Sequence, residues 1–449
     1  METGPSGGFF APFGRQDDGG FVMSKQWDAY RVSQAFAARV KTLYGAGDAV
    51  LDKQRARYGE LVRRFEERFG AADEGLCFFS APGRTEIGGN HTDHNAGRVL
   101  AAAVDLDTVA CAQRTQDGVI VVDSEGFDPI TVPVDALEVR EEDYGTTRAL
   151  IRGTAGIMRE MGFTVGGFRA TVQSSVLRGS GLSSSAAFEV LIAAILDGLY
   201  NGFAMDAKLR ALIAQKVENV YFGKPCGLMD QMASSVGGLV TIDFETEDAQ
   251  VEALAFDFAE RGYALCVVNT GGDHGDLTDD YAAIRSEMEA VAAQFGKRVL
   301  RQVPLADVEG NIAKLREAVG ERAVLRALHF YDDNARVVEQ VASLRAGELE
   351  KFFDLVTRSG DSSWKLLQNV YARPAEEQMA LGIELSRRFL RGDGAQRVHG
   401  GGFAGTIQAY VPLARLEAYR KMIESAFGAG SCTPLMIRPE GAVMMPMEA

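Results

Sequence analysis

A run of glycines and serines, followed at once by an apolar helical pattern, is the first part of this sequence that could do chemistry. The run reads Gly179-Ser180-Gly181-Leu182-Ser183-Ser184-Ser185-Ala186. Glycine lets the backbone approach a ligand closely, and the free N–H groups at the start of a helix attract an anion. Serine hydroxyls can bind phosphate oxygens or a magnesium ion. The run is neither a Walker A motif nor a dinucleotide fingerprint, so a phosphate site and an ordinary serine cap are equally open.

A second polar stretch, residues 81–94, is what we call the signature segment. Its sequence is Ala81-Pro82-Gly83-Arg84-Thr85-Glu86-Ile87-Gly88-Gly89-Asn90-His91-Thr92-Asp93-His94. Arg, Glu, Asn, Asp and two His side chains fall within eleven positions. Such a set can recognise a polyhydroxylated ligand, because it both donates and accepts hydrogen bonds. We expect a glycine-punctuated loop. Two other interpretations stay open: a metal site made by His91, Asp93 and His94, and a merely solvated loop.

A third segment carries a carboxylate next to the start of an expected helix. It reads Cys226-Gly227-Leu228-Met229-Asp230-Gln231-Met232-Ala233-Ser234, with Asp230 as its sole acid. An acid in this place can cap the helix or act as a base on a nearby sugar hydroxyl. Taken alone, the segment favours the cap.

Hydrophobic periodicity predicts the elements that must position these three segments. Apolar residues recur every three or four positions over 50–69 and indicate an amphipathic helix. Strands are expected at 76–79, 119–122, 130–134, 171–176, 263–269 and 407–411. Helices are expected from the Gly/Ser run to Asn201-Gly202, over 206–222, from the third segment onward, and through most of the chain to about 390. This mixture predicts the α+β class.

The chain is long enough for two packed domains, since it has 449 residues of which 46% are hydrophobic. Strand-rich sequence gives way to helix-rich sequence near residue 244, where we expect a domain boundary. The expected parts are a flexible glycine-rich tail at 1–22, an N-terminal extension at 23–56, a ligand-binding N-terminal domain at 57–243 and a C-terminal domain at 244–449.

Charge and cysteine content restrict the partners and the compartment. The formal net charge is -15, whereas nucleic acid or an anionic membrane needs a basic face. A nucleotide site stays possible, because it needs only local backbone donors and one or two cations. Five cysteines without a C-x-x-C pair, no secretory signal and no long apolar stretch predict a cytoplasmic protein. We expect a monomer or a weak oligomer.

Taken in the order in which they occur along the chain, the three segments resemble motifs of the GHMP kinase superfamily and of the galactokinase family within it. The signature segment is similar to G-R-x-N-L-I-G-E-H-T-D-Y, the Gly/Ser run to the ATP loop G-x-G-L-S-S-S-A, and the third segment to C-G-I-M-D-Q. A fourth motif, G-G-G-F-A-G at 400–405, resembles the family's C-terminal glycine-rich motif. The resemblance covers about residues 57–430. It implies an N-terminal half like ribosomal protein S5 domain 2, a ferredoxin-like C-terminal half, and an active site between them.

The resemblance also implies an activity, the transfer of the γ-phosphate of ATP to the anomeric hydroxyl of galactose with Mg²⁺. By motif position, Asp230 would take or orient the proton of the C1 hydroxyl, and Arg84 would stabilise charge beside it. Ser185 and Glu218 would hold Mg²⁺, Glu218 because its segment matches A-E-H-x-x-x-G-x-P-C-G. The residues expected to contact ATP are Gly179, Ser180, Gly181, Leu182, Ser183, Ser184, Ser185 and Ala186. Those expected to contact the sugar are Glu86, Asn90, His91, Asp93, His94, Gly227 and Tyr281.

Three positions depart from the family signature, since Glu86, Asn90 and His94 stand where galactokinases carry Asn, Glu and Tyr. A glutamate at position 90 would accept a hydrogen bond from a C6 hydroxyl and repel a C6 carboxylate, whereas Asn90 is neutral. We therefore expect looser discrimination at C6. The alternatives are a 1-kinase for galacturonate, L-arabinose or N-acetylgalactosamine, and a non-catalytic galactokinase-like sugar sensor.

Overall fold

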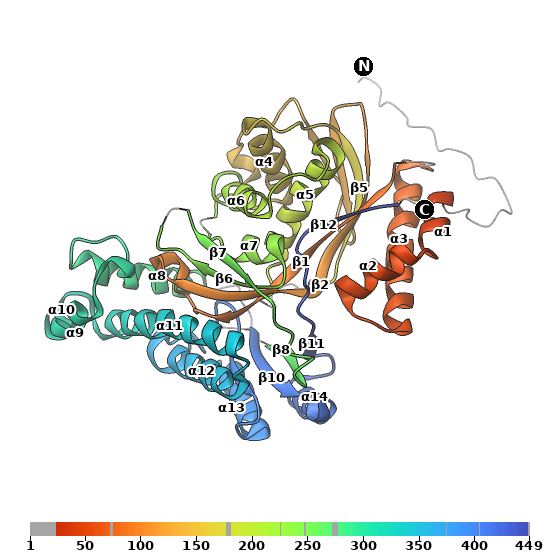
Figure 1. Ribbon diagram of the computed structural model, residues 1–449. Helices are drawn as coiled ribbons and strands as arrows, with labels where there is room; N and C mark the ends of the chain where they lie inside the picture. Colours follow the sequence, from red (N-terminus) through yellow and green to blue (C-terminus); the bar gives the residue numbers. More distant parts are fainter. Residues whose placement is uncertain are drawn as a thin grey trace, which may run out of the picture.

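Two β-sheets form the framework of the protein (Figure 1). The computed structural model describes residues 24–71, 75–176, 181–224, 226–246, 248–271, 277–373, 375–403 and 405–447. Among these residues, the larger sheet has eight strands and the smaller sheet has four. Helices and strands alternate irregularly along the chain, so the expected α+β class is confirmed.

The larger sheet runs in the order β12-β1-β2-β5-β3-β4, and β6 and β7 extend it from β2. Its strands are β1 (Cys77–Gly88), β2 (Arg98–Arg114), β3 (Val119–Ser124), β4 (Ile130–Pro133), β5 (Phe168–Ser174), β6 (Leu239–Asp243), β7 (Gln250–Leu254) and β12 (Val443–Pro446). β2 is long because its two ends have different partners: 98–102 pairs with β6 and 108–114 with β5. The sequence pattern did not indicate β2, because its many alanines carry a weak strand signal.

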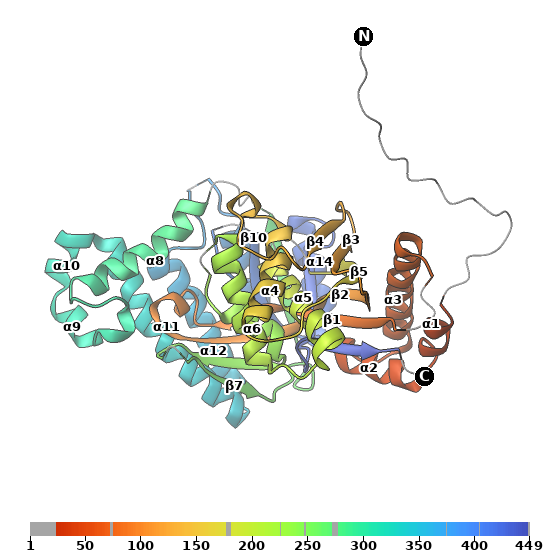
Figure 2. The ribbon, with the colours of Figure 1, turned by 90° about the horizontal axis from the view of Figure 1, so that it is seen from above.

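Helices cover both faces of the larger sheet. On one face lie α1 (Lys25–Tyr30), α2 (Gln34–Tyr44) and α3 (Asp48–Phe69), and on the other lie α4 (Thr147–Glu160), α5 (Ser184–Asn201), α6 (Ala207–Val217) and α7 (Met229–Val236) (Figures 1 and 2). Side chains alternate between the faces of a strand, so Phe78 packs with α1–α3 while Phe79 packs with α4–α6. The helix expected at 50–69 is confirmed as α3, which runs across the expected division at residue 56.

The smaller sheet, in the order β11-β8-β10-β9, lies with most helices of the second half. Its strands are β8 (Tyr263–Gly271), β9 (Ala395–Val398), β10 (Gly405–Pro412) and β11 (Cys432–Leu435). The helices are α8 (Thr278–Ala293), α9 (Leu305–Gly310), α10 (Ile312–Val319), α11 (Glu321–Ala346), α12 (Leu349–Ser362), α13 (Gln378–Leu390) and α14 (Leu416–Phe427). Short 3₁₀ turns are η1 (Asp93–Asn95), η2 (Glu141–Asp143), η4 (Leu300–Gln302) and η6 (Leu413–Arg415), and π turns are η3 (Glu218–Phe222) and η5 (Ser363–Leu367). No helix in the described ranges is long and apolar enough to cross a bilayer.

An apolar cluster joins the two sheets. Ile87 and Leu100 of the larger sheet pack with Val337 of α11, Phe352 of α12 and Tyr410 of β10. The expected boundary at 244 falls inside the β6–β7 hairpin, because β7 still pairs with β6. Near the C-terminus, β12 returns to pair with β1. The chain therefore crosses between the halves more than once, and its exact division into domains stays a prediction.

The signature segment is only partly a loop. Residues 81–88 belong to β1 and are buried, because pairing with β2 satisfies their backbone in spite of the glycines and the proline. The expected loop is thus wrong for this half, and only the part that follows turns away, through η1. The helix expected at 206–222 also ends early, since α6 stops at Val217 and the π turn η3 follows.

Candidate functional site

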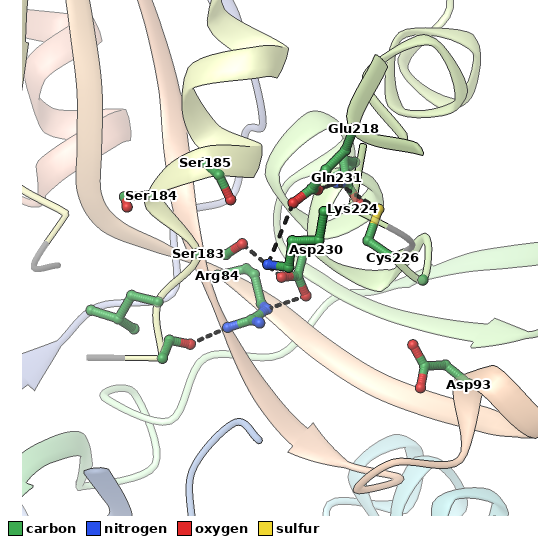
Figure 3. A pocket seen from close by; sticks show the side chains of 13 residues that line it. Arg84, Asp93, Ser183, Ser184, Ser185, Glu218, Lys224, Cys226, Asp230 and Gln231 are labelled. Atoms are coloured by element: carbon green, nitrogen blue, oxygen red, sulfur yellow. Dashed lines mark hydrogen bonds and ion pairs between the residues drawn. The ribbon is translucent and has the colours of Figure 1, made fainter. Parts of the chain in front are cut away.

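A polar cavity of about 360 Å³ lies where β1 and the starts of α5 and α7 meet (Figure 3). Its lining residues are Arg84, Asp93, Gly181, Leu182, Ser183, Ser184, Ser185, Glu218, Lys224, Cys226, Gly227, Asp230 and Gln231. All three segments that the sequence pointed to therefore contribute to one cavity. Ala186 is fully buried and does not line it. Gly179 and Ser180 lie outside the described residues.

An ion pair between Arg84 and Asp230 lies at the centre of the lining. Nε of Arg84 donates to Oδ1 of Asp230 at 2.7 Å, and another nitrogen of the guanidinium donates to the Gly181 carbonyl. The backbone N–H of Arg84 donates to the Leu182 carbonyl at 3.0 Å. Arg84 therefore fixes the positions of the Gly/Ser run and of α7 relative to β1.

The start of α5 differs from an ordinary capped helix. Ser183 precedes the helix with φ 56° and ψ 66°, a left-handed conformation that is uncommon for a residue with a side chain. Its hydroxyl donates to Oδ2 of Asp230 at 2.6 Å and does not cap the helix. The first N–H groups of α5 are therefore not taken up by Ser183, and they can bind an anion. The plain serine-cap interpretation of the run is not supported.

The surroundings keep Asp230 ionised. Burial by itself raises the pKa of a carboxyl group, but the charge and hydrogen bond of Arg84, with the hydroxyl of Ser183, outweigh burial and lower the pKa of Asp230 below its ordinary value. Asp93, which Figure 3 shows apart from Asp230, behaves in the opposite way. Burial raises the pKa of Asp93, and the charge of Asp230 adds to the rise. Of the two carboxyl groups, Asp230 is the one suited to accept a proton.

Glu218 enters the cavity from η3 and is held there by Gln231. Nε2 of Gln231 donates to Oε2 of Glu218 at 2.8 Å and to Oε2 of Glu189 at 3.3 Å. Glu189 is fully buried, and burial followed by the charge of Glu218 raises the pKa of Glu189 well above its ordinary value. One amide thus fixes the direction of Glu218.

Ser185 and Glu218, the two residues that the resemblance implies as magnesium ligands, line the same cavity. A hydroxyl and a carboxylate supply oxygen donors of the kind that Mg²⁺ takes, and phosphate oxygens and water fill the other positions in nucleotide sites. The donor set therefore fits Mg²⁺ bound together with a nucleotide. Across the described ranges, no group of three or more His, Cys, Asp or Glu side chains could hold a metal. The alternative metal site at His91, Asp93 and His94 is therefore not formed.

Of the residues expected to contact a sugar, Asp93 and Gly227 line the cavity. A Cβ atom at Gly227 would lie 2.1 Å from Oδ2 of Asp93, so any other residue at this position would displace the Asp93 carboxylate. The cavity also has lining residues that the sequence pattern did not indicate as functional: Lys224, Cys226 and Gln231. The sequence could have indicated Gln231, because this residue directly follows Asp230 in the motif that resembles C-G-I-M-D-Q.

Glu86 and Asn90 do not line the cavity and lie in the contact between the two halves. Asn90 is fully buried, and its Nδ2 group donates to Oε1 of Glu86 at 2.9 Å and to the Gly400 carbonyl at 2.8 Å. Its Oδ1 atom accepts from the side chains of Ser363 and Asn369. Both polar atoms of the Asn90 side chain are thus engaged, which leaves the expected contact with C6 of a sugar without support.

Further buried side chains complete this arrangement. Arg397 donates to Oε1 of Glu86 at 2.7 Å, with the two side chains 0% and 5% exposed. Asp333 accepts the backbone N–H of Asn90 at 2.8 Å, and Nε2 of His329 lies 2.9 Å from the Asn90 carbonyl oxygen. Burial raises the pKa of Glu86, although Arg397 opposes the rise. We call this set the buried network: Glu86, Asn90, His329, Asp333, Asn369 and Arg397.

His91, His94 and Tyr281 lie around the turn that ends the signature segment. Nε2 of His91 is 2.9 Å from the Gly401 carbonyl oxygen, and the Tyr281 hydroxyl donates to the Gly402 carbonyl at 2.7 Å. Both side chains therefore contact the C-terminal glycine-rich motif. Burial lowers the pKa of His94 well below its ordinary value, so His94 is neutral. None of the three lines the cavity as described, and their roles as sugar ligands stay predictions.

Known proteins of one family resemble this chain over most of its length. A family model described as "Galactokinase galactose-binding signature" matches residues 63–114, and one described as "GHMP kinases N terminal domain" matches 149–238. The galactokinase of Streptomyces coelicolor is 32% identical over 374 residues, which cover 83% of this chain and 93% of that protein. The galactokinase of Glaesserella parasuis is 32% identical over 370 residues, which cover 80% of this chain and 91% of that protein.

Solved structures share the fold. A Lactococcus lactis galactokinase complexed with galactose has a TM-score of 0.74 at 23% identity, covering 85% of this chain and 97% of that one. A Methanococcus jannaschii mevalonate kinase has a TM-score of 0.58 at 15% identity, covering 80% and 98%. These likenesses bear out the two-domain GHMP kinase fold that the sequence motifs implied.

Proposed function

This chain belongs to the galactokinase family of the GHMP kinases, and on that premise we propose that it transfers the γ-phosphate of ATP to the anomeric hydroxyl of galactose. The products are galactose 1-phosphate and ADP. One observation carries the proposal: the ionised Asp230 and the fixed guanidinium of Arg84 meet in the cavity that the start of α5 also lines. A base, a cation and an anion-binding helix start are the parts that phosphoryl transfer to a hydroxyl requires.

Asp230 is the proton acceptor in this proposal. The proton of the C1 hydroxyl passes to its carboxylate while the bond between the C1 oxygen and the γ-phosphorus forms. The bond from the γ-phosphorus to the bridging oxygen breaks, and ADP leaves. Arg84 holds Asp230 in place through Nε and stabilises negative charge on the transferring group. Because this reaction leaves the protein little covalent work, positioning and charge supply most of the catalysis.

Ser185 and Glu218 would hold the Mg²⁺ ion that accompanies ATP. When bound, the ion neutralises charge on the β- and γ-phosphates. Gln231 supports this role by fixing the Glu218 carboxylate. The residues from Gly181 to Ser185 that line the cavity would bind the phosphates, chiefly through backbone N–H groups at the start of α5.

Asp93 and Gly227 would contact the sugar, because they line the same cavity as Asp230. His91 and Tyr281 would complete the sugar site from the turn that they form with the glycine-rich motif. The acidic composition and the five cysteines without a C-x-x-C pair support a cytoplasmic enzyme that acts on small molecules as a monomer or a weak oligomer.

A coupled assay of ADP release tests the proposal. The purified protein is given MgATP and, in separate reactions, galactose, galacturonate, L-arabinose or N-acetylgalactosamine, and the product is identified as a 1-phosphate by its phosphorus–carbon coupling. Galactose is expected to give the highest kcat/KM. Failure to phosphorylate any of the four sugars would contradict a sugar kinase, and a higher kcat/KM with another sugar would replace galactose as the substrate.

A further inference from the structure

Lys224 is a cation at the cavity to which neither the sequence motifs nor the mechanism above gives a role. Its Nζ atom lies 3.7 Å from Oε1 of Glu218, and Figure 3 shows the two side chains joined across the cavity. The Lys224 side chain is 66% exposed. The family motif quoted for this segment leaves the position before Pro-Cys-Gly unspecified, so the resemblance implies nothing for it.

The backbone before Lys224 is firmly placed. Gly223 ends η3 with φ 78° in the left-handed region, where glycine is favoured. A Cβ atom at Gly223 would lie 2.8 Å from the ring of Tyr144, so the turn packs closely against that ring. The backbone N–H of Lys224 donates to the Glu218 carbonyl at 3.1 Å. A fixed backbone with a long, mobile side chain suits a lysine that meets a ligand at a defined place.

Lys224 is held less firmly by its neighbours than Arg84, so its ammonium group is more available to a ligand. Arg84 bonds Asp230 at 2.7 Å and also donates to the Gly181 carbonyl. Lys224 has a longer ion pair with Glu218, at 3.7 Å, and its own side chain is 66% exposed. A triphosphate brings far more negative charge than one carboxylate. The ammonium group can therefore turn from Glu218 toward a phosphate oxygen.

The position of Lys224 indicates which phosphate it meets. In the proposed mechanism the transferred group must lie between Asp230, which receives the proton, and Glu218, which would hold Mg²⁺ together with the nucleotide. Lys224 pairs with Glu218 directly, and its charge also acts on Asp230. The ammonium group thus lies within reach of the space between the two carboxylates.

We propose that the Lys224 ammonium group binds the non-bridging oxygens of the transferred phosphoryl group. The inference rests on the proposed kinase function of the same cavity. It makes Lys224 a catalytic residue, because charge develops on those oxygens as the phosphoryl group moves and a fixed cation stabilises it.

An ordinary surface ion pair in the same protein provides the matched control. Lys216 lies 3.6 Å from Glu160, with the two side chains 53% and 61% exposed, and neither residue lines the cavity. Lys224→Met and Lys216→Met remove the same charge and keep a similar side-chain length. Lys224→Arg keeps the charge with a different shape.

Two measurements test the proposal on these variants and the wild type. Single-turnover phosphorylation of galactose should fall by roughly 10²-fold in Lys224→Met, by less in Lys224→Arg, and not measurably in Lys216→Met. Calorimetric titration without sugar should show that Lys224→Met weakens binding of MgATP by about tenfold, the scale of one charged hydrogen bond. Binding of MgADP, which lacks the γ-phosphate, should change much less.

Equal behaviour of Lys224→Met and Lys216→Met would overturn the proposal. So would equal weakening of MgATP and MgADP binding, because Lys224 would then contact only phosphates that both nucleotides share. If the wild type phosphorylates no sugar, the proposed function fails, while the contrast between MgATP and MgADP still decides the contact of Lys224.

Discussion

Glu86 lies on strand β1 and Asp230 pairs with a residue of the same strand, but the two carboxylates have opposite surroundings. Glu86 belongs to β1 and pairs with Arg397, and the two side chains are 5% and 0% exposed. Asp230 pairs with Arg84 of β1, and its side chain is 30% exposed at the cavity. Both are Arg–carboxylate pairs at 2.7 Å. The first is enclosed among buried side chains, and the second keeps an open side.

This difference shows why residue type and spacing do not decide a role. Glu86 accepts hydrogen bonds from both Arg397 and Asn90 inside the protein. The Glu86–Arg397 pair therefore serves to join the two halves of the chain. Asp230 is held by Arg84 and Ser183 but still lines a cavity, so a ligand can reach it. The buried network should therefore govern stability, and the cavity should govern activity.

Breaking the Glu86–Arg397 pair tests the first half of this comparison and should have the largest effect. Arg397→Met leaves Glu86 buried without its counter-charge, which costs about 3–5 kcal/mol of unfolding free energy. Urea unfolding measures the cost, with Arg388→Met as the control, because Arg388 is 73% exposed beside Glu384.

The stability of Arg397→Met should change with pH in a defined direction. Burial raises the pKa of Glu86, and removal of Arg397 raises it further. A group whose folded pKa is raised stabilises the protein below its unfolded pKa of about 4.3 and loses that contribution as pH rises through the folded pKa. The deficit of Arg397→Met relative to wild type should thus be larger at pH 8 than near pH 5. The double variant Glu86→Gln/Arg397→Met should regain stability, and no regain would mean that the pair is not what holds this region.

Asp230→Asn tests the second half of the comparison. It should lower kcat by roughly 10²-fold or more, because an amide cannot accept the proton, while the thermal midpoint changes little. Steady-state ADP release and thermal unfolding measure both quantities. Asp248→Asn is the control, since Asp248 is 79% exposed and pairs with Lys208 at the surface. Turnover of Asp230→Asn at a rate near wild type would show that the cavity carboxylate is structural.

Gln231→Leu sharpens the comparison inside the cavity. Loss of the amide frees Glu218 from its hydrogen bond at 2.8 Å, and loss of such an orienting partner costs about 10–100-fold in metal affinity. The Mg²⁺ concentration for half-maximal activity should rise by that factor. Binding of Mn²⁺ in the presence of ATP gives a second readout. The control is Gln250→Leu on the exposed strand β7, and an unchanged metal requirement in Gln231→Leu would contradict the role of Gln231.

Asn90→Ser should have the smallest effect on activity. Since the Asn90 side chain is saturated within the buried network, the ratio of kcat/KM for galactose to that for L-arabinose should stay within about twofold of wild type, less than the factor that one neutral hydrogen bond contributes. Urea unfolding should show a loss of stability. A ratio changed by fivefold or more would place Asn90 at the sugar, as the departure from the family signature first indicated.

The sequence alone determined which chemistry this protein could perform. The Gly/Ser run, Arg84 and Asp230 were evident from residue type and motif spacing. Amphipathic periodicity located α3, start and end signals located α5, and an apolar run located the strand β8. Such signals are local, because a helix or a short strand is written in neighbouring residues. Resemblance in order and spacing then indicated the fold and the family.

Only the tertiary structure decided which of these residues meet and which side chains stay open. Asn90 looked like a sugar ligand, but its side chain is hydrogen-bonded to Glu86, Gly400, Ser363 and Asn369, and three of these four partners lie more than 270 positions away along the sequence. The sequence pattern assigned no role to Lys224, and the end of η3 brings it to Glu218. The physical reason is the same in both cases. A polar side chain can bind a ligand only through donors or acceptors that other groups of the protein have not already used. Which of them stay unused depends on partners from distant parts of the chain.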